Sequence, residues 1–496
     1  MALHGVPADA DHQSIVLLDR LISVTEAAGF PGSAGGKVLQ VEVERHVPTP
    51  EPLREVEGRA VVLRGLEVRG PGSWFEHGLP RVDLLDTQLY TLDRAELYRF
   101  ASRSIPEEVS DMTAGRIVDA DSHILEPAEM WVEYMEPEFK SRALRINRDE
   151  KGLEYLDIDG LVSAGYSGGL GSMAGVGKSL EWKAENATKP YSEQARLTPA
   201  AIDPHERIRF MDQEGVDFTF LYPTLGLGWE GECEDAALSA AYCRAYNNWM
   251  VDFCRPQRER IIPIAHVSVR DVNEGVKELE RVAKLGMKGV FISPHALNGI
   301  RYGHEYYDPF WNAAQELQMP VTLHVVFNPS YVGRHLYPED EGLGPSFFVE
   351  TMLIGDFLLS FTSMMCDGVF EKFPGLRLVM VEVGCGWISH WLDEMDANYE
   401  KFGRGMPLTM KPSDYFKRQC WISAEPTENS IAAMAQHVGA DRFLWGSDWP
   451  HTEGHIDPVR KVKERITSLS EDDQRKILGE NALTLYRMET PAHTVG

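Results

Sequence analysis

From residue 117 onward the sequence alternates short apolar runs with helical segments, and this rhythm limits the fold more than any other feature. The runs, each a candidate strand, lie at residues 117–121, 218–222, 261–266, 289–292, 321–324, 378–383, 420–423 and 443–446. Amphipathic candidate helices lie between most of them, for example at 203–214, 235–253, 272–285 and 309–317. Eight strands in alternation with helices predict a (β/α)₈ barrel, although a doubly wound sheet gives the same alternation.

Three of these runs end in side chains that bind metals. The first ends with Asp121 and His123, the fifth ends with His324, and the eighth leads directly to Asp448. Closure of a barrel brings the first and eighth strands together, and the carboxyl ends of barrel strands form the active site. Each motif alone is explained by a capping turn or a buried histidine. Because imidazoles and carboxylates from three strand ends suit a divalent ion, we predict all four as ligands of one metal.

Other side chains near the strand ends are candidates for catalysis and substrate binding. Glu382 interrupts the sixth run, where it would contact the metal, act as a base, hold the substrate, or form a structural salt bridge with an arginine. Asp448 would also exchange a proton with metal-bound water. His451 would either orient Asp448 or hydrogen-bond within its loop. We predict Asp448 and Glu382 as catalytic residues, and His295, Trp387 and His451 as substrate-binding residues.

The composition limits the partners and the compartment. A net charge of −27 argues against nucleic acid or an anionic membrane as partner, and it says nothing direct about a small-molecule substrate. No apolar stretch reaches the roughly 18 residues that a membrane span needs, and the N-terminus lacks the pattern of a signal peptide. The six cysteines form no C-x-x-C pair, as is typical of reduced thiols. We expect a soluble cytoplasmic protein.

Residues 1–115 differ from the rest and predict a small α+β extension. Its candidate helices lie at 15–22 and 92–102, and its candidate strands lie at 39–43, 61–63 and 82–90. No motif in this part carries recognisable chemistry. A packing or oligomerisation module is therefore favoured over a catalytic one, and we assign the metal-dependent barrel to residues 116–496.

Two long segments, 140–200 and 328–346, are predicted to be insertions over the barrel mouth. The first contains a glycine-rich stretch at 168–179, which invites comparison with a phosphate-binding loop. That motif needs glycine where Ser172 stands, so the spacing fails. A lid or a substrate-binding loop is the favoured interpretation of both insertions.

These motifs resemble those of the amidohydrolase superfamily, in particular the amidohydrolase-2 branch that includes aminocarboxymuconate-semialdehyde decarboxylase. The resemblance covers about residues 116–490. The matching stretches are 118–123, His324, 373–379, 384–387, 441–451 and 477–482. It implies a distorted (β/α)₈ barrel with one divalent metal ion, zinc or manganese, and a homodimer.

The chain departs from this family pattern at two positions. The first ligand is Asp121, where family members have histidine or glutamate, and the extra carboxylate makes manganese plausible beside zinc. Glu382 stands where the family has a strand-six histidine that serves as acid–base partner. The fourth run lacks a lysine that would bridge two metals, which favours a single ion.

The lead hypothesis for function is a metal-dependent hydrolase of a small aromatic substrate. Metal-bound water, deprotonated by Asp448 or Glu382, would attack the carbon of an amide, ester or related acyl bond. The alternative is nonoxidative decarboxylation of an aromatic or unsaturated acid, in which Asp448 protonates the ring carbon. That reaction calls for an arginine near the metal, and the sequence does not place one. A catalytically inactive scaffold is disfavoured because all four proposed ligands are intact.

Overall fold

The computed structural model describes residues 60–68, 82–92, 115–327, 348 and 351–488. The chain divides into two compact units, residues 1–112 and 113–496. In the first unit, β1 (Ala60–Val68) and β2 (Val82–Leu92) form an antiparallel pair with an irregularity between Arg64 and Leu66. Both strands were predicted, at 61–63 and 82–90. The predicted helices at 15–22 and 92–102 and the strand at 39–43 lie outside the described residues.

The second unit is a closed parallel barrel. One sheet runs in the order β14-β13-β12-β11-β10-β9 and another in the order β3-β7-β8, and every neighbouring pair in both is parallel. A parallel bridge between Ser122 and Trp449 joins the last strand to the first. The strands are β3 (Val118–His123), β7 (Phe218–Tyr222), β8 (Ile261–Pro263), β9 (Ala265–His266), β10 (Val290–Ile292), β11 (Val321–Leu323), β12 (Leu378–Met380), β13 (Cys420–Ala424) and β14 (Phe443–Trp445).

The predicted α/β barrel is thus confirmed, with two differences in the strands. The predicted third strand divides at Ile264 into β8 and β9. The predicted sixth strand is shorter than 378–383, because β12 ends at Met380 and Glu382 has a left-handed backbone (φ 57°) that no strand can continue through.

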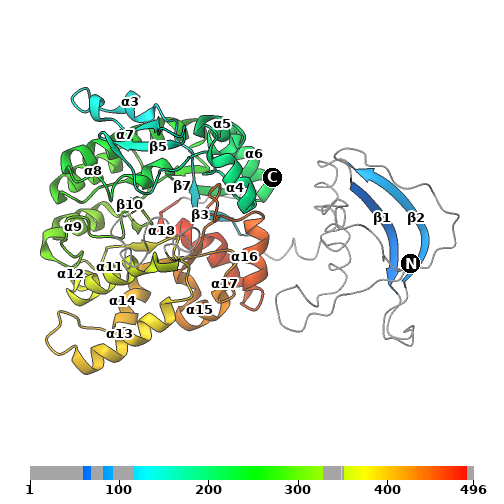
Figure 1. Ribbon diagram of the computed structural model, residues 1–496. Coiled ribbons are helices and arrows are strands. Elements are labelled where there is room, and N and C mark those ends of the chain that lie inside the picture. Colours follow the sequence, from blue (N-terminus) through cyan, green and yellow to red (C-terminus); the bar gives the residue numbers. More distant parts are fainter. Residues whose placement is uncertain (1–59, 69–81, 93–114, 328–347, 349–350, 489–496) are drawn as a thin grey trace. The chain divides into compact units, whose positions relative to one another are not determined.

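Helices surround the strands (Figure 1). Three of the long ones begin at an aspartate, Asp203, Asp235 or Asp271, whose side chain accepts two backbone N–H groups of the first turn. The α-helices of the barrel are α3 (Met130–Tyr134), α6 (Pro204–Glu214), α7 (Ala236–Cys254), α8 (Val272–Lys284), α9 (Asp308–Leu317), α11 (Ile354–Cys366), α12 (Val369–Lys372), α13 (Ile388–Phe402), α14 (Pro412–Gln419), α15 (Ile431–Val438), α16 (Pro458–Ile466), α17 (Glu471–Arg475) and α18 (Asn481–Leu485).

Short helical turns complete the barrel. They are η2 (Lys140–Arg142), η3 (Pro199–Ala201), η4 (Leu225–Gly228), η5 (Arg255–Gln257), η6 (Glu305–Tyr307), η8 (Ala440–Arg442) and the π-turn η9 (Lys476–Glu480). No helix in the described ranges is long and apolar enough to cross a bilayer.

The insertion at 140–200 has its own structure, which the sequence did not predict. It contains an antiparallel sheet of β4 (Arg145–Arg148), β5 (Glu154–Ile158) and β6 (Leu161–Val162), followed by α4 (Leu180–Ala187) and α5 (Tyr191–Arg196). Val176 N–H donates to Pro450 O (3.2 Å), and Thr452 Oγ1 donates to Ser172 O (3.2 Å). The insertion therefore packs on the loop that follows β14. Its role as a lid stays a prediction, and the insertion at 328–346 lies outside the described residues.

Candidate active site

The end of β3 supplies two inward-facing donors. Side chains two residues apart on a strand share a face, so Asp121 and His123 both point to the barrel axis. Both are almost completely buried, and His123 Nε2 lies 3.5 Å from Asp121 Oδ1. Burial alone would raise the pKa of Asp121, but His123 and His324 hold it below the usual range of a carboxyl.

The other two predicted ligands reach the same point. His324 follows β11, and its Nε2 lies 3.4 Å from Asp121 Oδ1. Asp448 follows β14, and its Oδ1 lies 3.2 Å from His123 Nε2. Barrel closure thus brings together Asp121, His123, His324 and Asp448. The first and the last of them are 327 residues apart in the sequence.

Backbone carbonyls fix the orientation of both imidazoles. His123 Nδ1 lies 2.7 Å from Pro223 O, and His324 Nδ1 lies 2.8 Å from Val325 O. Because a carbonyl only accepts, each Nδ1 carries the hydrogen and each Nε2 presents its lone pair to the centre. Burial lowers the pKa of His123 to about 3, which keeps the ring neutral. Neutral imidazole with a free Nε2 is the form that binds a metal.

The lack of hydrogen-bond partners for several of the buried donor atoms indicates that the site holds a cation. Asp121 Oδ1, His123 Nε2, His324 Nε2 and Glu382 Oε2 are buried atoms with no hydrogen-bond partner among the described residues. A buried polar atom without a partner costs roughly 1–3 kcal/mol. Three of these atoms, Asp121 Oδ1, His123 Nε2 and His324 Nε2, belong to one group of donors within 4.8 Å of one another, which is explained by an ion that they share. The expectation of one divalent metal site therefore fits the structure.

Glu382 lies beside this cluster and has a strained backbone. Its Oε2 is 3.4 Å from Nδ1 of His324, and no arginine pairs with it among the described residues, unlike the salt bridge considered from the sequence. Glu382 and Asp448 both have left-handed φ angles, 57° and 51°, which cost energy in residues other than glycine and occur often at functional sites. Burial, with the nearby Asp448 and Asp121, raises the pKa of Glu382 well above its usual value.

His451 lies between Asp448 and a residue that the sequence analysis missed. Its Nδ1 is 2.8 Å from Asp448 Oδ1, and its Nε2 is 2.8 Å from Thr224 Oγ1. The ring also lies against that of His123, with the centroids 3.9 Å apart. Thr224 follows the apolar strand β7, and a polar residue at that position was the signal that could have identified it.

His295 and Trp387 have no hydrogen bond or ion pair with the donor cluster in the described residues. His295 lies on the turn after β10 and is partly exposed, with Nδ1 3.4 Å from Oδ1 of the buried Asp356. Trp387 is half-buried, and its Nε1 donates to Gly384 O (3.0 Å). Their predicted contact with substrate is untested.

Asp119 is a second residue that the sequence analysis missed. It accepts from Ser447 N–H (2.9 Å) and Ser447 Oγ (2.6 Å), so it holds the backbone beside Asp448. Burial raises the pKa of Asp119 to about 7. A carboxylate inside the apolar start of β3 was the available signal.

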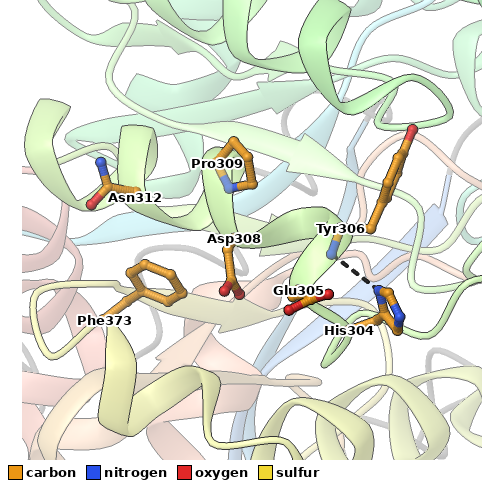
Figure 2. A pocket seen from close by; sticks show the side chains of 7 residues that line it. All are labelled: His304, Glu305, Tyr306, Asp308, Pro309, Asn312 and Phe373. Atoms are coloured by element: carbon orange, nitrogen blue, oxygen red, sulfur yellow. Dashed lines mark hydrogen bonds between the residues drawn. The ribbon is translucent and has the colours of Figure 1, made fainter.

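An open hollow of about 770 Å³ lies elsewhere, at the start of α9 (Figure 2). In it, Tyr306 N–H donates to His304 Nδ1 (3.1 Å). It is lined by His304, Glu305, Tyr306, Asp308, Pro309, Asn312 and Phe373. None of these is a candidate ligand or catalytic residue, so the hollow does not mark the active site.

The family follows from a match to residues 118–488. The model of the Amidohydro_2 family, described as amidohydrolase, covers that range and so includes all four candidate ligands. The chain belongs to the amidohydrolase family. The resemblance inferred from the motifs is confirmed.

Individual proteins similar to this amidohydrolase were also found. A gamma-resorcylate decarboxylase from Polaromonas sp. (strain JS666) is 28% identical over 313 residues, which are 60% of this chain and 92% of that protein. Among solved structures, an amidohydrolase from Mycobacterium avium subsp. paratuberculosis K-10 has a TM-score of 0.63 at 23% identity and covers 75% of this chain and 99% of its own.

A second solved structure is a dihydroxybenzoic acid decarboxylase from Polaromonas sp. JS666, with bound manganese and the inhibitor 2-nitroresorcinol. Its TM-score is 0.55 at 20% identity, with coverage of 77% of this chain and 100% of its own. These structures share the barrel fold. The lead hypothesis of a hydrolase is contradicted, because the curated relatives are decarboxylases.

Proposed function

We propose that this amidohydrolase is a metal-dependent, nonoxidative decarboxylase of a hydroxylated aromatic carboxylic acid. The observation that carries the proposal is a pair of buried donor groups that share His123: Asp121 and His324 lie on one side of it and Asp448 on the other, so two imidazoles and two carboxylates are available to one ion. The relatives named as gamma-resorcylate decarboxylases support the reaction class.

Manganese is the metal we propose for this site. Carboxylate oxygens suit Mn²⁺ and imidazole suits several divalent ions, so the donors do not decide between Mn²⁺ and Zn²⁺. The manganese in the similar dihydroxybenzoic acid decarboxylase favours Mn²⁺. When bound, such an ion would polarise the carboxylate and the neighbouring hydroxyl oxygen of the substrate.

Decarboxylation breaks the bond between the ring carbon and the carboxylate carbon, and leaves the electron pair on the ring. That ring carbon must then receive one proton. We assign its delivery to Asp448, which His451 contacts through Nδ1 at 2.8 Å. Thr224 Oγ1 holds the opposite ring nitrogen and so keeps His451 aimed at the carboxylate. Protonated His451 can then pass its Nδ1 proton to Asp448 and take up one from solvent, so that each turnover consumes one solvent proton.

Glu382 is assigned to the substrate side of the cluster. Its raised pKa favours the protonated form, which donates a hydrogen bond. A protonated carboxyl next to Asp448 can therefore hold an oxygen of an anionic substrate without repelling it.

His295 is our candidate for a second contact with the acid. Arg207 donates to His123 O, but it is buried and its other hydrogen bonds go to Ser122 and Ala200. His295 remains partly exposed at the end of β10, with the buried carboxylate of Asp356 behind it. Trp387 would offer an aromatic face to the ring of the substrate.

The test is turnover of protein reloaded with Mn²⁺ on 2,6-dihydroxybenzoate, 2-hydroxybenzoate and unsubstituted benzoate. We expect carbon dioxide and the matching phenol from the hydroxylated acids, by mass spectrometry, and neither product from the Asp448→Asn variant. Metal-loaded protein that releases no carbon dioxide from any hydroxylated aromatic acid would overturn the proposal.

Two further predictions concern assembly and location. A homodimer is proposed from the family resemblance, and light scattering of the full chain tests it. Residues 1–115 are proposed as a packing or oligomerisation module, and a cytoplasmic location is proposed from the sequence. Removal of that segment should change the oligomeric state and leave metal binding by the barrel intact.

A further inference from the structure

Arg207 is a buried cation whose surroundings are unusual. It lies on α6 and is only 1% exposed. Arginines at such depth are normally paired with a carboxylate, because burying an unpaired charge is costly. In the described part of the chain, none of the hydrogen bonds of Arg207 goes to a carboxylate. They go to Ser122 Oγ (2.9 Å), Ala200 O (2.8 Å) and His123 O.

The same guanidinium also lies over an aromatic ring from the far end of the chain. The central carbon of the guanidinium, Cζ of Arg207, is 4.4 Å from the ring centroid of Trp449, the residue after the candidate ligand Asp448. Phe210, one turn further along α6, stacks on the same indole at 4.3 Å. One helix thus contacts both the end of β3 and the segment after β14.

These two segments form the seam where the barrel closes. His123 N–H donates to Trp449 O (2.7 Å), Ser122 Oγ donates to the same oxygen (3.1 Å), and Asp448 N–H donates to Asp121 O (2.9 Å). Three of the four candidate ligands, Asp121, His123 and Asp448, therefore lie on the two sides of one seam. A shift of either side changes the distances between their donor atoms.

We infer that Arg207 is a positioning residue for the metal centre: it fixes the seam between β3 and Trp449 and thereby sets the affinity for the ion. The inference rests on the metal site of the proposed function. A charged donor makes stronger hydrogen bonds than a neutral one, and its fork holds Ser122 and His123 O together. The contact with the indole of Trp449 holds the other side of the seam in place.

The test compares the Mn²⁺ affinity of the full-length wild-type protein with that of the full-length Arg207→Lys variant, both measured without substrate. Stripped protein is titrated with Mn²⁺ against a chelator, and the melting temperature of the stripped form is recorded in parallel. We expect Arg207→Lys to lose about 10- to 100-fold in Mn²⁺ affinity, the usual effect of removing a group that orients ligands. Lysine keeps the charge and loses the fork.

Arg260→Lys is the matched control. Arg260 also donates to two backbone carbonyls, Val216 O and Asp217 O, but it bonds to none of the ligand-bearing residues. Its variant should keep wild-type Mn²⁺ affinity. A purely structural role for Arg207 would lower the melting temperature of the stripped protein and leave the affinity unchanged, and that result would overturn the inference.

Ser122→Ala keeps the inference testable if Arg207→Lys does not fold. It removes one acceptor of Arg207 and should weaken Mn²⁺ binding by less than Arg207→Lys would. Unchanged affinity in a folded Ser122→Ala protein would count against the inference. Wild-type protein that binds Mn²⁺ tightly but releases no carbon dioxide would overturn the proposed function and leave this inference standing. An active Arg207→Lys variant with unaltered Mn²⁺ affinity would overturn this inference and leave the proposed function standing.

Discussion

His451 Nδ1 lies 2.8 Å from Asp448 Oδ1, and its opposite nitrogen lies 2.8 Å from Thr224 Oγ1. This arrangement gives the threonine control over the carboxylate that we assign to proton delivery. Thr224→Val should lower kcat about 10-fold and leave the metal content unchanged. Steady-state kinetics with metal analysis of the same samples is the measurement.

Thr219→Val is the matched control for that prediction. Thr219 lies on β7, the strand that Thr224 follows, and its buried Oγ1 has no hydrogen-bond partner among the described residues. Its replacement should leave kcat unchanged. Equal activity of both valine variants would show that the hydroxyl at His451 is not needed.

Gly446 should tolerate no side chain. A Cβ there would lie 2.3 Å from Cβ of Asp121, well inside the contact limit. Gly446→Ala should therefore displace Asp121, cost about 1–3 kcal/mol of stability and reduce metal affinity at least about 10-fold. Gly375→Ala, where the closest atom is on the flexible side chain of Gln315 at 3.3 Å, is the control. Thermal melts and chelator competition check both effects, and wild-type metal affinity in Gly446→Ala would contradict the geometry.

Removal of the metal should lower the melting temperature. An ion that binds only the folded state stabilises it by about 3–4 kcal/mol at 100 to 1,000 times its Kd. His324→Ala should lose this metal-dependent increment, because Nε2 of His324 faces the centre. His437→Ala, at a mostly exposed position, should keep it. Thermal melts with and without Mn²⁺ measure this increment. If His324→Ala gained as much in melting temperature from Mn²⁺ as wild type does, His324 would not be a ligand.

The contact assigned to His295 predicts a change in substrate binding. His295→Ala should raise KM for the hydroxylated acid about 10-fold and change kcat little, because a lost hydrogen bond to a charged group costs about 1.5–3 kcal/mol. His304→Ala, in the hollow at the start of α9, is the control. The opposite pattern, a lower kcat at unchanged KM, would place His295 in the chemical step.

Glu214 should give the barrel a pH-dependent loss of stability. Burial, with a contribution from Asp457, raises its pKa from 4.5 to about 7. Because the folded pKa is the higher one, the stabilising effect is present below 4.5 and is lost as the pH rises through about 7. Glu214→Gln should therefore be more stable than wild type at about pH 8, by about 1 kcal/mol after allowance for partial exposure, and similar to it near pH 4.

Urea unfolding at both pH values measures this difference. Glu185→Gln, at an exposed position on α4, is the control. A stability gain in Glu214→Gln that is the same at both pH values would exclude titration of Glu214 as its cause.

The strands of the barrel could be predicted because their apolar runs are continuous and separated by amphipathic segments. The candidate ligands could be predicted because polar residues end three of those runs. Thr224 and Arg207 could not, because their contacts join residues that come close only in three dimensions: Thr224 contacts His451, and Arg207 contacts His123 and Trp449. The end of β12 was misplaced because Glu382 adopts a backbone conformation that local pattern does not encode.

The reaction class was the main error of the sequence analysis. Metal-bound water and a metal-bound acid need the same ligands, so the motifs at Asp121 and Asp448 fit hydrolysis and decarboxylation equally well. The choice depends on what the rest of the pocket holds, and short motifs contain no information on that. Relatives named as gamma-resorcylate decarboxylases support decarboxylation.

The bridge between Ser122 and Trp449 links completion of the candidate metal site to the order in which the barrel strands assemble. The last barrel strand is also the last to leave the ribosome, and Asp448 follows it. A nascent chain that has not yet docked β14 presents Asp121 and His123 without their carboxylate partner. The proposed set of four ligands is therefore complete only after β14 has docked beside β3.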